Sequence, residues 1–193
     1  ESTQQSLLNR VAYDYNLTDD LSFSASVDFN HHDVVTRDSV QQTGYDENRS
    51  ELSWLLSVQK SFAGRLNLNL MLRQDVVDFR SAPLVPYLGF DFKILQNREL
   101  ILKGNIARNF HQPTLNDLYW QPGGNPDLLP EKGTSTEIGL EYATRIRSAQ
   151  ISMEITAFRS DIDNWILWTP SHKGYWEPRN IRRVLSGGLE FSA

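Results

Sequence analysis

The chain has 193 residues, of which 39% are hydrophobic and 22% are charged, and its formal net charge is −5 at pH 7. No stretch approaches the roughly 18 consecutive apolar residues of a membrane-spanning helix, so helical membrane proteins are excluded. The absence of cysteine excludes a disulfide scaffold and a thiolate metal site. Lys and Arg are scattered along the chain, which argues against a nucleic-acid partner.

Most of the chain alternates between apolar and polar residues, which is the period of a β-strand whose faces meet different environments. The alternation is clearest from Leu21 to Phe29, where every odd position is apolar and every even position is polar. Nine such runs predict an all-β fold of nine strands joined as antiparallel hairpins, with almost no helix. They are residues 7–17, 21–29, 52–62, 66–72, 84–94, 100–106, 138–142, 151–157 and 182–191.

The predicted connections alternate between short and long. The long ones run from about His31 to Asn48, Phe110 to Lys132 and Asp163 to Asn180, and Arg80 to Pro86 is a shorter member of the same set. In an up-and-down sheet all four would emerge at one rim, with the short turns at the other rim. This arrangement is typical of outer-membrane β-barrels, and the Ser, Asn, Gln and Thr residues of the polar face suit a barrel lumen.

A soluble β-sandwich or lipocalin-like barrel is the alternative that the strand pattern leaves open. The two architectures differ in where they place the apolar residues of the strands. A membrane barrel turns these residues outward to lipid, whereas a sandwich buries them in a core. Positions that distinguish the two are Phe23, Val27, Leu68, Leu70, Phe90 and Phe92.

Residues 109–131 differ from the rest of the chain because they hold four of its eight prolines, so they are neither strand nor helix throughout. Residues 122–124 and 125–127 predict tight turns. We expect an ordered Ω-like loop, since the segment has apolar residues of its own to pack. These are Leu118, Tyr119, Trp120 and Leu128.

Residues 107–120, 124–131 and 137–141 together closely resemble the barrel signature of TonB-dependent outer-membrane receptors. The resemblance is strongest over residues 84–193, and the family usually has Lys where this chain has Leu129. The positions that match the family motif, for which we expect structural roles, are Asn109, Phe110, Pro113, Asn125, Pro126, Leu128, Pro130, Glu131, Glu137 and Gly139.

The resemblance implies a 22-stranded transmembrane barrel around an N-terminal plug. It also implies import of a scarce nutrient across the outer membrane of a Gram-negative bacterium, driven by the TonB complex. Residues 1–193, with about nine strands and no recognisable plug, are then expected to be a fragment of the barrel domain. Its partners would be the remaining strands and plug, the TonB complex, outer-membrane lipid and a small nutrient.

Within the family, the Asn-Asp-Leu-Tyr-Trp and Pro-Gly-Gly-Asn-Pro motifs are most similar to cobalamin-type receptors of the Bacteroidetes, with ferric-siderophore receptors close behind. Neither a cofactor nor a bound metal is expected. Candidate ligand contacts are the loop residues Trp120, Asn125, Asp127, Trp165, Trp168 and Trp176.

Each candidate has a structural alternative, which we favour. The tryptophans are either a stacking surface for a flat ligand or the aromatic girdle at the membrane interface. The loop from Phe110 to Glu131 is either a ligand contact or a structural clamp.

Metal binding and catalysis find little support. The residues His31, His32, Asp33, Asp38, Asp46 and Glu47 could hold a divalent cation through carboxylate oxygens, or could belong to a solvated loop. Because neighbouring strand residues point to opposite faces, the two histidines cannot easily share a metal. No hydrolase, phosphate-binding or zinc motif occurs, so no enzyme is expected. His111 and His172 would be the bases to test.

Overall fold

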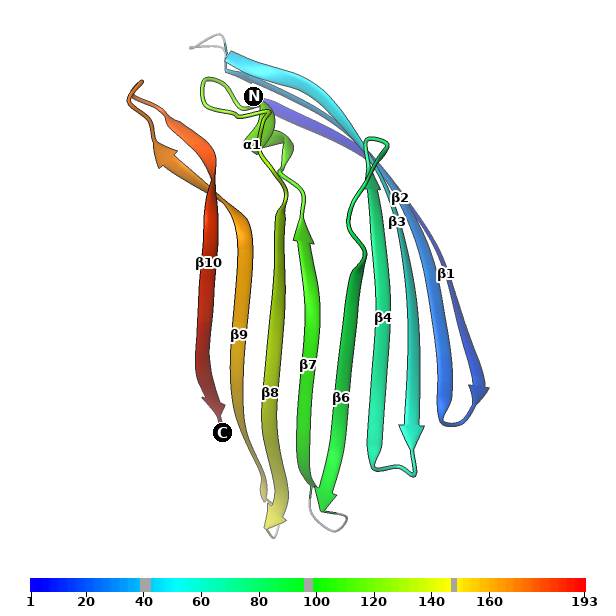
Figure 1. Cartoon of the computed structure of the whole chain (residues 1–193). Helices are drawn as coiled ribbons and strands as arrows, with labels where there is room; N and C mark the ends of the chain where they lie inside the picture. Colours follow the sequence, from blue (N-terminus) through cyan, green and yellow to red (C-terminus); the bar gives the residue numbers. More distant parts are fainter. Residues whose placement is uncertain (39–42, 96–98, 147–148) are drawn as a thin grey trace.

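The computed structural model describes residues 1–38, 43–95, 99–146 and 149–193, and most of them lie in β-strands (Figure 1). One short helix, α1 (Leu115–Tyr119), lies between β7 and β8. The strands are β1 (Ser2–Thr18), β2 (Leu21–Asp38), β3 (Thr43–Phe62), β4 (Leu66–Val77), β5 (Arg80–Ser81), β6 (Val85–Leu95), β7 (Glu99–His111), β8 (Glu131–Ile146), β9 (Ala149–Pro170) and β10 (Trp176–Ser192).

The strands join one antiparallel sheet within the described part of the chain. Its order is β1-β2-β3-β4-β6-β7-β8-β9-β10, and the two-residue β5 pairs with the end of β4. Every long strand therefore lies beside its neighbour in the sequence, which confirms the predicted up-and-down arrangement of nine strands. In the described residues, no helix has both the length and the apolarity needed to cross a membrane.

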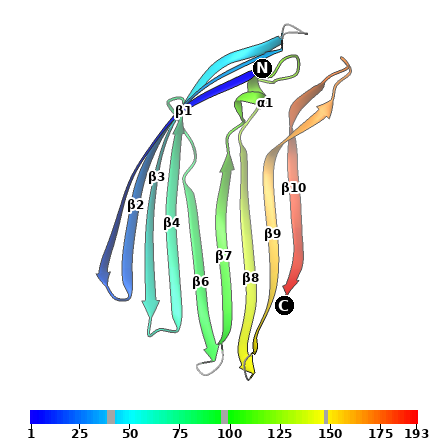
Figure 2. The same cartoon turned by 180° about the vertical axis from the view of Figure 1, so that it is seen from behind.

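The connections divide between the two rims as predicted (Figures 1 and 2). The β1–β2 turn consists of residues 19–20 and the β3–β4 turn of residues 63–65, and both lie at the lower rim, where β6 and β8 end and β7 and β9 begin. The upper rim carries β5, the β9–β10 turn and the long β7–β8 connection with α1.

Two of the predicted long loops are wrong over most of their length. Strand β2 continues to Asp38 and β3 begins at Thr43, while β9 continues to Pro170 and β10 begins at Trp176. The ladder is continuous here, with Asp33 opposite Asn48. The alternation of apolar and polar residues is weak at these upper ends, although backbone pairing continues. Strand limits predicted from this alternation therefore fall short of the true strand ends.

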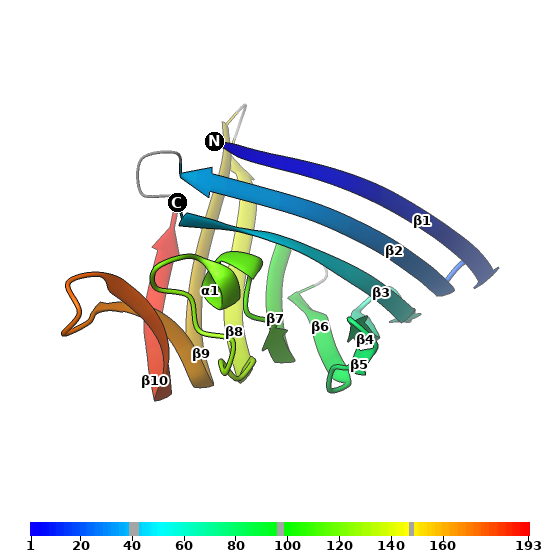
Figure 3. The same cartoon turned by 90° about the horizontal axis from the view of Figure 1, so that it is seen from above.

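The sheet is curved, and α1 lies inside the curve (Figure 3). Polar residues of β1 to β9 line a hollow of about 810 Å³, among them Asn16, Gln59, Asn69, Lys103 and Thr156. One hollow shared by so many consecutive strands lies on the concave face. The apolar residues of the same strands therefore point to the convex face.

The register joins these apolar residues into rows across the convex face. Phe23 pairs with Val58, Val58 with Leu70, and Leu70 with Leu88. Phe23, Val27 and Leu70 are 39%, 49% and 51% exposed, and Leu68, Phe90 and Phe92 are half-buried.

No second sheet covers this apolar face within the described residues. The buried hydrophobic residues among them are Val77, Ala82, Leu128 and Ala143, which do not amount to a sandwich core. The sandwich alternative is therefore wrong, and the surface-exposed apolar face expected of a barrel wall is confirmed.

Candidate functional site

The helix α1 is encoded locally by the residues before and within its first turn. Thr114 is the N-cap, and its Oγ1 accepts a hydrogen bond from the backbone N–H of Asp117 at 3.1 Å. Asp117 Oδ2 in turn accepts from the backbone N–H of Thr114 at 2.8 Å. This reciprocal capping box satisfies donors that a helix start would otherwise leave unpaired.

On one side, this segment is fastened to β3. Arg49 Nη1 donates to the carbonyl oxygen of Pro113 at 2.8 Å, and the Tyr45 hydroxyl donates to Asn116 Oδ1 at 2.5 Å. The Arg49 side chain is only 9% exposed, and its Nε lies 3.7 Å from Asp78 Oδ2. Asp78 belongs to the turn between β4 and β5, so the guanidinium joins β3 to two other parts of the chain.

On the other side, the segment is fastened to β9. Trp168 Nε1 donates to Asp117 Oδ1 at 2.8 Å. Since β3 and β9 are separated in the sheet by β4, β6, β7 and β8, the segment spans the concave face near its upper rim.

The rest of the β7–β8 connection is hydrogen-bonded to β9 and β10. The contacts made by the Asn180 side chain are called the Asn180 clasp. Asn180 Oδ1 accepts from the backbone N–H of Leu129 at 2.8 Å, and Asn180 Nδ2 donates to the carbonyls of Leu129 and Asn164 at 2.9 and 2.8 Å. Glu131 Oε1 accepts from the backbone N–H of Ile166 at 2.7 Å. Asn125 Nδ2 donates to the Pro178 carbonyl at 3.3 Å.

A hollow of about 850 Å³ lies between α1 and the upper ends of β1 to β3. Its volume falls in the range of small-molecule sites, which combine aromatic walls with a few polar groups. The residues that line this hollow include His32, Tyr45, Arg49, Glu51, Asn116 and Trp120.

The six candidate ligand residues do not converge on this hollow. Trp120 lines it and is 39% exposed. The indole N–H of Trp168 and the amide of Asn125 are engaged in the contacts described above. Trp165 occupies an odd position of β9, so its side chain lies on the convex face, opposite to Trp168.

The remaining two candidates, Trp176 and Asp127, are exposed, and Trp176 is 59% exposed at the start of β10. Asp127 contributes its backbone N–H to Asn125 Oδ1 at 3.0 Å. A ligand role for any of the six stays a prediction.

Several family-motif residues have structural contacts. Pro113 is fully buried and Leu128 is 8% exposed. Asn109 Nδ2 donates to Ser135 Oγ at 2.6 Å, and Glu137 Oε2 accepts from Asn105 Nδ2 at 3.0 Å. At Gly139 a Cβ atom would lie 2.8 Å from Thr156 Oγ1. Phe110 on β7 and Pro130 are half-buried, whereas Pro126 is exposed.

Arg49 and Tyr45 form the β3 side of the site, although no sequence pattern identifies them as candidates. Both lie in a stretch that was predicted to be a loop, and their partners are 64 and 71 positions away in the sequence. No local pattern distinguishes a buried arginine of this kind from a solvated one.

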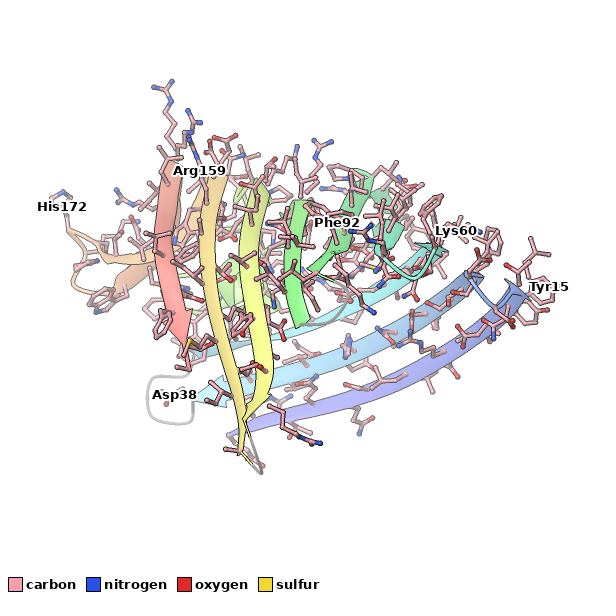
Figure 4. All side chains as sticks on the ribbon, turned by 90° about the horizontal axis from the view of Figure 1, so that it is seen from below. Tyr15, Asp38, Lys60, Phe92, Arg159 and His172 are labelled. Atoms are coloured by element: carbon pink, nitrogen blue, oxygen red, sulfur yellow. The ribbon has the colours of Figure 1, made fainter. Side chains whose placement is uncertain are left out.

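The candidate cation ligands do not form a cluster. His31 Nδ1 bonds Ser50 Oγ at 2.9 Å, while His32 Nδ1 bonds Ser6 Oγ at 2.8 Å from the opposite face. Across residues 1–38, 43–95, 99–146 and 149–193, no three His, Asp or Glu side chains gather as a metal site would require. His111 ends β7, and His172 projects from the β9–β10 turn (Figure 4).

A protein-family model described as "TonB dependent receptor-like, beta-barrel" matches residues 2–193. The vitamin B12 transporter BtuB of Photobacterium profundum is 30% identical over 191 residues, which cover 93% of this chain and 28% of that protein. The vitamin B12 transporter BtuB of Vibrio vulnificus (strain YJ016) is 39% identical over 90 residues, covering 46% of this chain and 14% of that protein. The chain thus spans less than a third of these curated relatives.

Solved structures agree on the fold. The ferric enterobactin receptor PfeA of Pseudomonas aeruginosa superposes with a TM-score of 0.82 at 18% identity, covering 98% of this chain and 33% of that chain. The siderophore receptor PirA of Pseudomonas aeruginosa has a TM-score of 0.77 at 17% identity, covering 97% of this chain and 38% of that chain.

Proposed function

Because this chain belongs to the TonB-dependent receptor β-barrel family, we propose that it forms part of the wall of an outer-membrane receptor that imports a scarce nutrient. The chain covers 28% of the length of one vitamin B12 transporter relative. The remaining strands, the plug and the segment that contacts the TonB complex would be supplied by the rest of a longer receptor. Strands β1 and β10 support this proposal, because within the described residues each pairs on one side only.

The convex face would contact outer-membrane lipid, and the concave face would contact the plug and the nutrient. The rows of exposed apolar residues support the first assignment, since a barrel wall needs an apolar band where it meets lipid. The polar hollow shared by β1 to β9 supports the second. Together they favour a role in transport over one in catalysis, and the relatives named above are transporters and receptors.

The nutrient would bind at the upper rim, against α1. The observation that carries this assignment is the 850 Å³ hollow, in which an aromatic side chain, Trp120, stands beside polar groups of three strands. A flat aromatic ring with a few convergent polar groups suits a ligand with a large planar surface. Among the six candidates, Trp120 is therefore the ligand contact that the geometry supports best.

Cobalamin is the nutrient we propose first. Two vitamin B12 transporters support it, one 30% identical over 93% of this chain and the other 39% identical over 46% of it. The siderophore receptors are similar at only 17–18% identity, which supports the fold and no particular ligand. A ferric siderophore remains the second candidate.

Calorimetry tests the proposal. The full-length receptor, purified in detergent, is titrated with cyanocobalamin and separately with a panel of ferric siderophores. Tight binding of cyanocobalamin alone would support the first candidate, and binding of a siderophore alone would overturn it in favour of the second. No binding by any of them would overturn both candidates.

Two tryptophan variants locate the site. We expect Trp120→Ala to weaken binding at least tenfold, as truncation of a central aromatic contact usually does. The matched control is Trp54→Phe on β3, whose side chain lies on the convex face beside its cross-strand partner Val27 and should leave the affinity unchanged. If Trp120→Ala bound the nutrient as tightly as the wild type, the hollow would not be the binding site.

A further inference from the structure

We infer that Arg49 and Asp117 are positioning residues that hold Pro113–Trp120 as a fixed crossbar over the concave face at the upper rim of the sheet. The crossbar is defined as these eight residues, which include α1. It presents Trp120 to the hollow before any ligand arrives. The ligand-related part of this inference rests on the proposed function, whereas the crossbar itself does not.

Asp117 joins the helix to the β9 wall through its two carboxylate oxygens. One oxygen, Oδ2, accepts from the backbone N–H of Thr114 at 2.8 Å and from its hydroxyl at 2.7 Å. The other oxygen, Oδ1, accepts from Trp168 Nε1 at 2.8 Å. The same charged group therefore starts the helix and ties it to β9, and hydrogen bonds to an ionised carboxylate are stronger than neutral ones.

Arg49 fixes the other end of the crossbar to β3. Its guanidinium is buried and donates to the carbonyl of Pro113, which is itself fully buried. Asp78, the carboxylate nearest to Arg49 Nε, is held in place because its Oδ1 accepts from the backbone N–H of Ser50 at 2.8 Å. The position of the crossbar is thus set relative to β3 and to the β4–β5 turn.

The helix needs these anchors because it is only five residues long. Isolated helices much shorter than a dozen residues are marginal in water, so the capping box alone does not keep α1 folded. Trp120 follows directly, and its backbone N–H donates to the Asn116 carbonyl at 3.0 Å. Loss of either anchor would therefore loosen the backbone that carries the Trp120 side chain.

Hydrogen–deuterium exchange of the full-length receptor without ligand tests the crossbar. The amides to follow are those of Leu118 and Trp120, which donate to carbonyls inside the crossbar. Trp168→Phe keeps an aromatic ring but removes the indole donor, and Arg49→Met removes the guanidinium. We expect each to speed exchange at these amides about tenfold, since each loses a hydrogen bond to or from a charged group.

Two controls separate positioning from general damage. Trp165→Phe, on the opposite face of β9, should leave exchange at Leu118 and Trp120 unchanged. Arg49→Lys should restore most of the protection, because its ammonium group can still donate to the Pro113 carbonyl. Unchanged exchange in both Trp168→Phe and Arg49→Met would overturn the inference.

Cyanocobalamin titration of the same variants tests the link to binding. If the crossbar presents Trp120, both anchor variants should weaken binding about tenfold, and Arg49→Lys should recover affinity along with amide protection. Faster exchange with unaltered affinity would overturn the positioning role. Faster exchange together with no binding by the wild type would leave the crossbar standing and refute cobalamin as the nutrient.

Discussion

The two rims of the sheet are held together in different ways. At the lower rim, side-chain contacts join neighbouring strands, as in the ion pair between Lys60 Nζ and Asp20 Oδ2 at 2.6 Å. At the upper rim, contacts such as Arg49 to Pro113 and Trp168 to Asp117 join parts of the chain 64 and 51 positions apart. The lower rim therefore follows from strand pairing alone, whereas the upper rim depends on how one long connection folds across the sheet.

The largest expected effect comes from a charge on the convex face, away from both rims. Leu70→Arg in the full receptor should cost about 2–4 kcal/mol of folding free energy in lipid, because the cation would lie near the middle of the bilayer. Equilibrium unfolding in phospholipid vesicles measures this loss. The matched control is Asn67→Arg on the concave face of the same strand, and an equal loss in both variants would contradict the assignment of faces.

Overpacking of the upper rim should have the next largest effect. A Cβ atom at Gly123 would lie 2.0 Å from the Trp176 carbonyl oxygen, which belongs to the backbone and cannot rotate away. We expect Gly123→Ala to destabilise the folded β7–β8 connection by about 1–3 kcal/mol, measured as faster amide exchange at Leu128. Gly188→Ala, whose added methyl group meets only the movable ring of Phe158 at 3.1 Å, should cost less.

Removal of the Asn180 clasp should have a smaller effect at the same rim. Asn180→Ala loses three hydrogen bonds, two of them to Leu129, and we expect a local cost of about 1–2 kcal/mol. Amide exchange at Leu129 reports the loss directly. Arg179→Ala serves as the control because the Arg179 side chain is exposed and donates to Glu177 of its own strand, not to the β7–β8 connection. Undiminished protection of Leu129 would show that the clasp is dispensable.

The smallest effect is expected at the lower rim and depends on pH. Hydrogen bonds from Lys60 and Thr18 hold the pKa of the exposed Asp20 carboxyl below its ordinary value of 3.8. A carboxyl whose pKa is lowered by folding stabilises the folded state above pH 3.8, and this contribution is lost as the pH falls through the lowered pKa. Asp20→Asn should thus be slightly less stable than the wild type at pH 7 and equally stable near pH 2. A gap that persists at pH 2 would contradict the ion pair as its cause.

The strands of this fold are predictable from sequence because the two faces of each strand meet two unlike environments. Alternation between Leu21 and Phe29 reports that difference residue by residue, and hairpin order then fixes the sheet. The ends of β2, β3, β9 and β10 were predicted as loops because their alternation is weak there. The predicted loop with its apolar residues was correct in outline, and Leu128 is indeed buried.

The site was less predictable than the sheet for a related reason. Trp120 and Asp117 lie in a segment whose prolines and glycines identify it as unusual, so their neighbourhood could be found. Arg49 could not, because its importance comes from a carbonyl group 64 positions away and from burial that only the folded connection creates. Local sequence reports the environment of a strand, but it does not report which distant loop will cover a given side chain.

The β9–β10 turn, residues 171–175, closes on itself beyond the Asn180 clasp. Its hydrogen bonds run from the Ser171 N–H to the Tyr175 carbonyl and from the Gly174 N–H to the Ser171 carbonyl, and Lys173 is exposed. The whole segment contains no cysteine, so Lys173→Cys would introduce its sole thiol. A fluorophore attached there would lie at the upper rim, outside the crossbar contacts, and would report on the hollow without disturbing them.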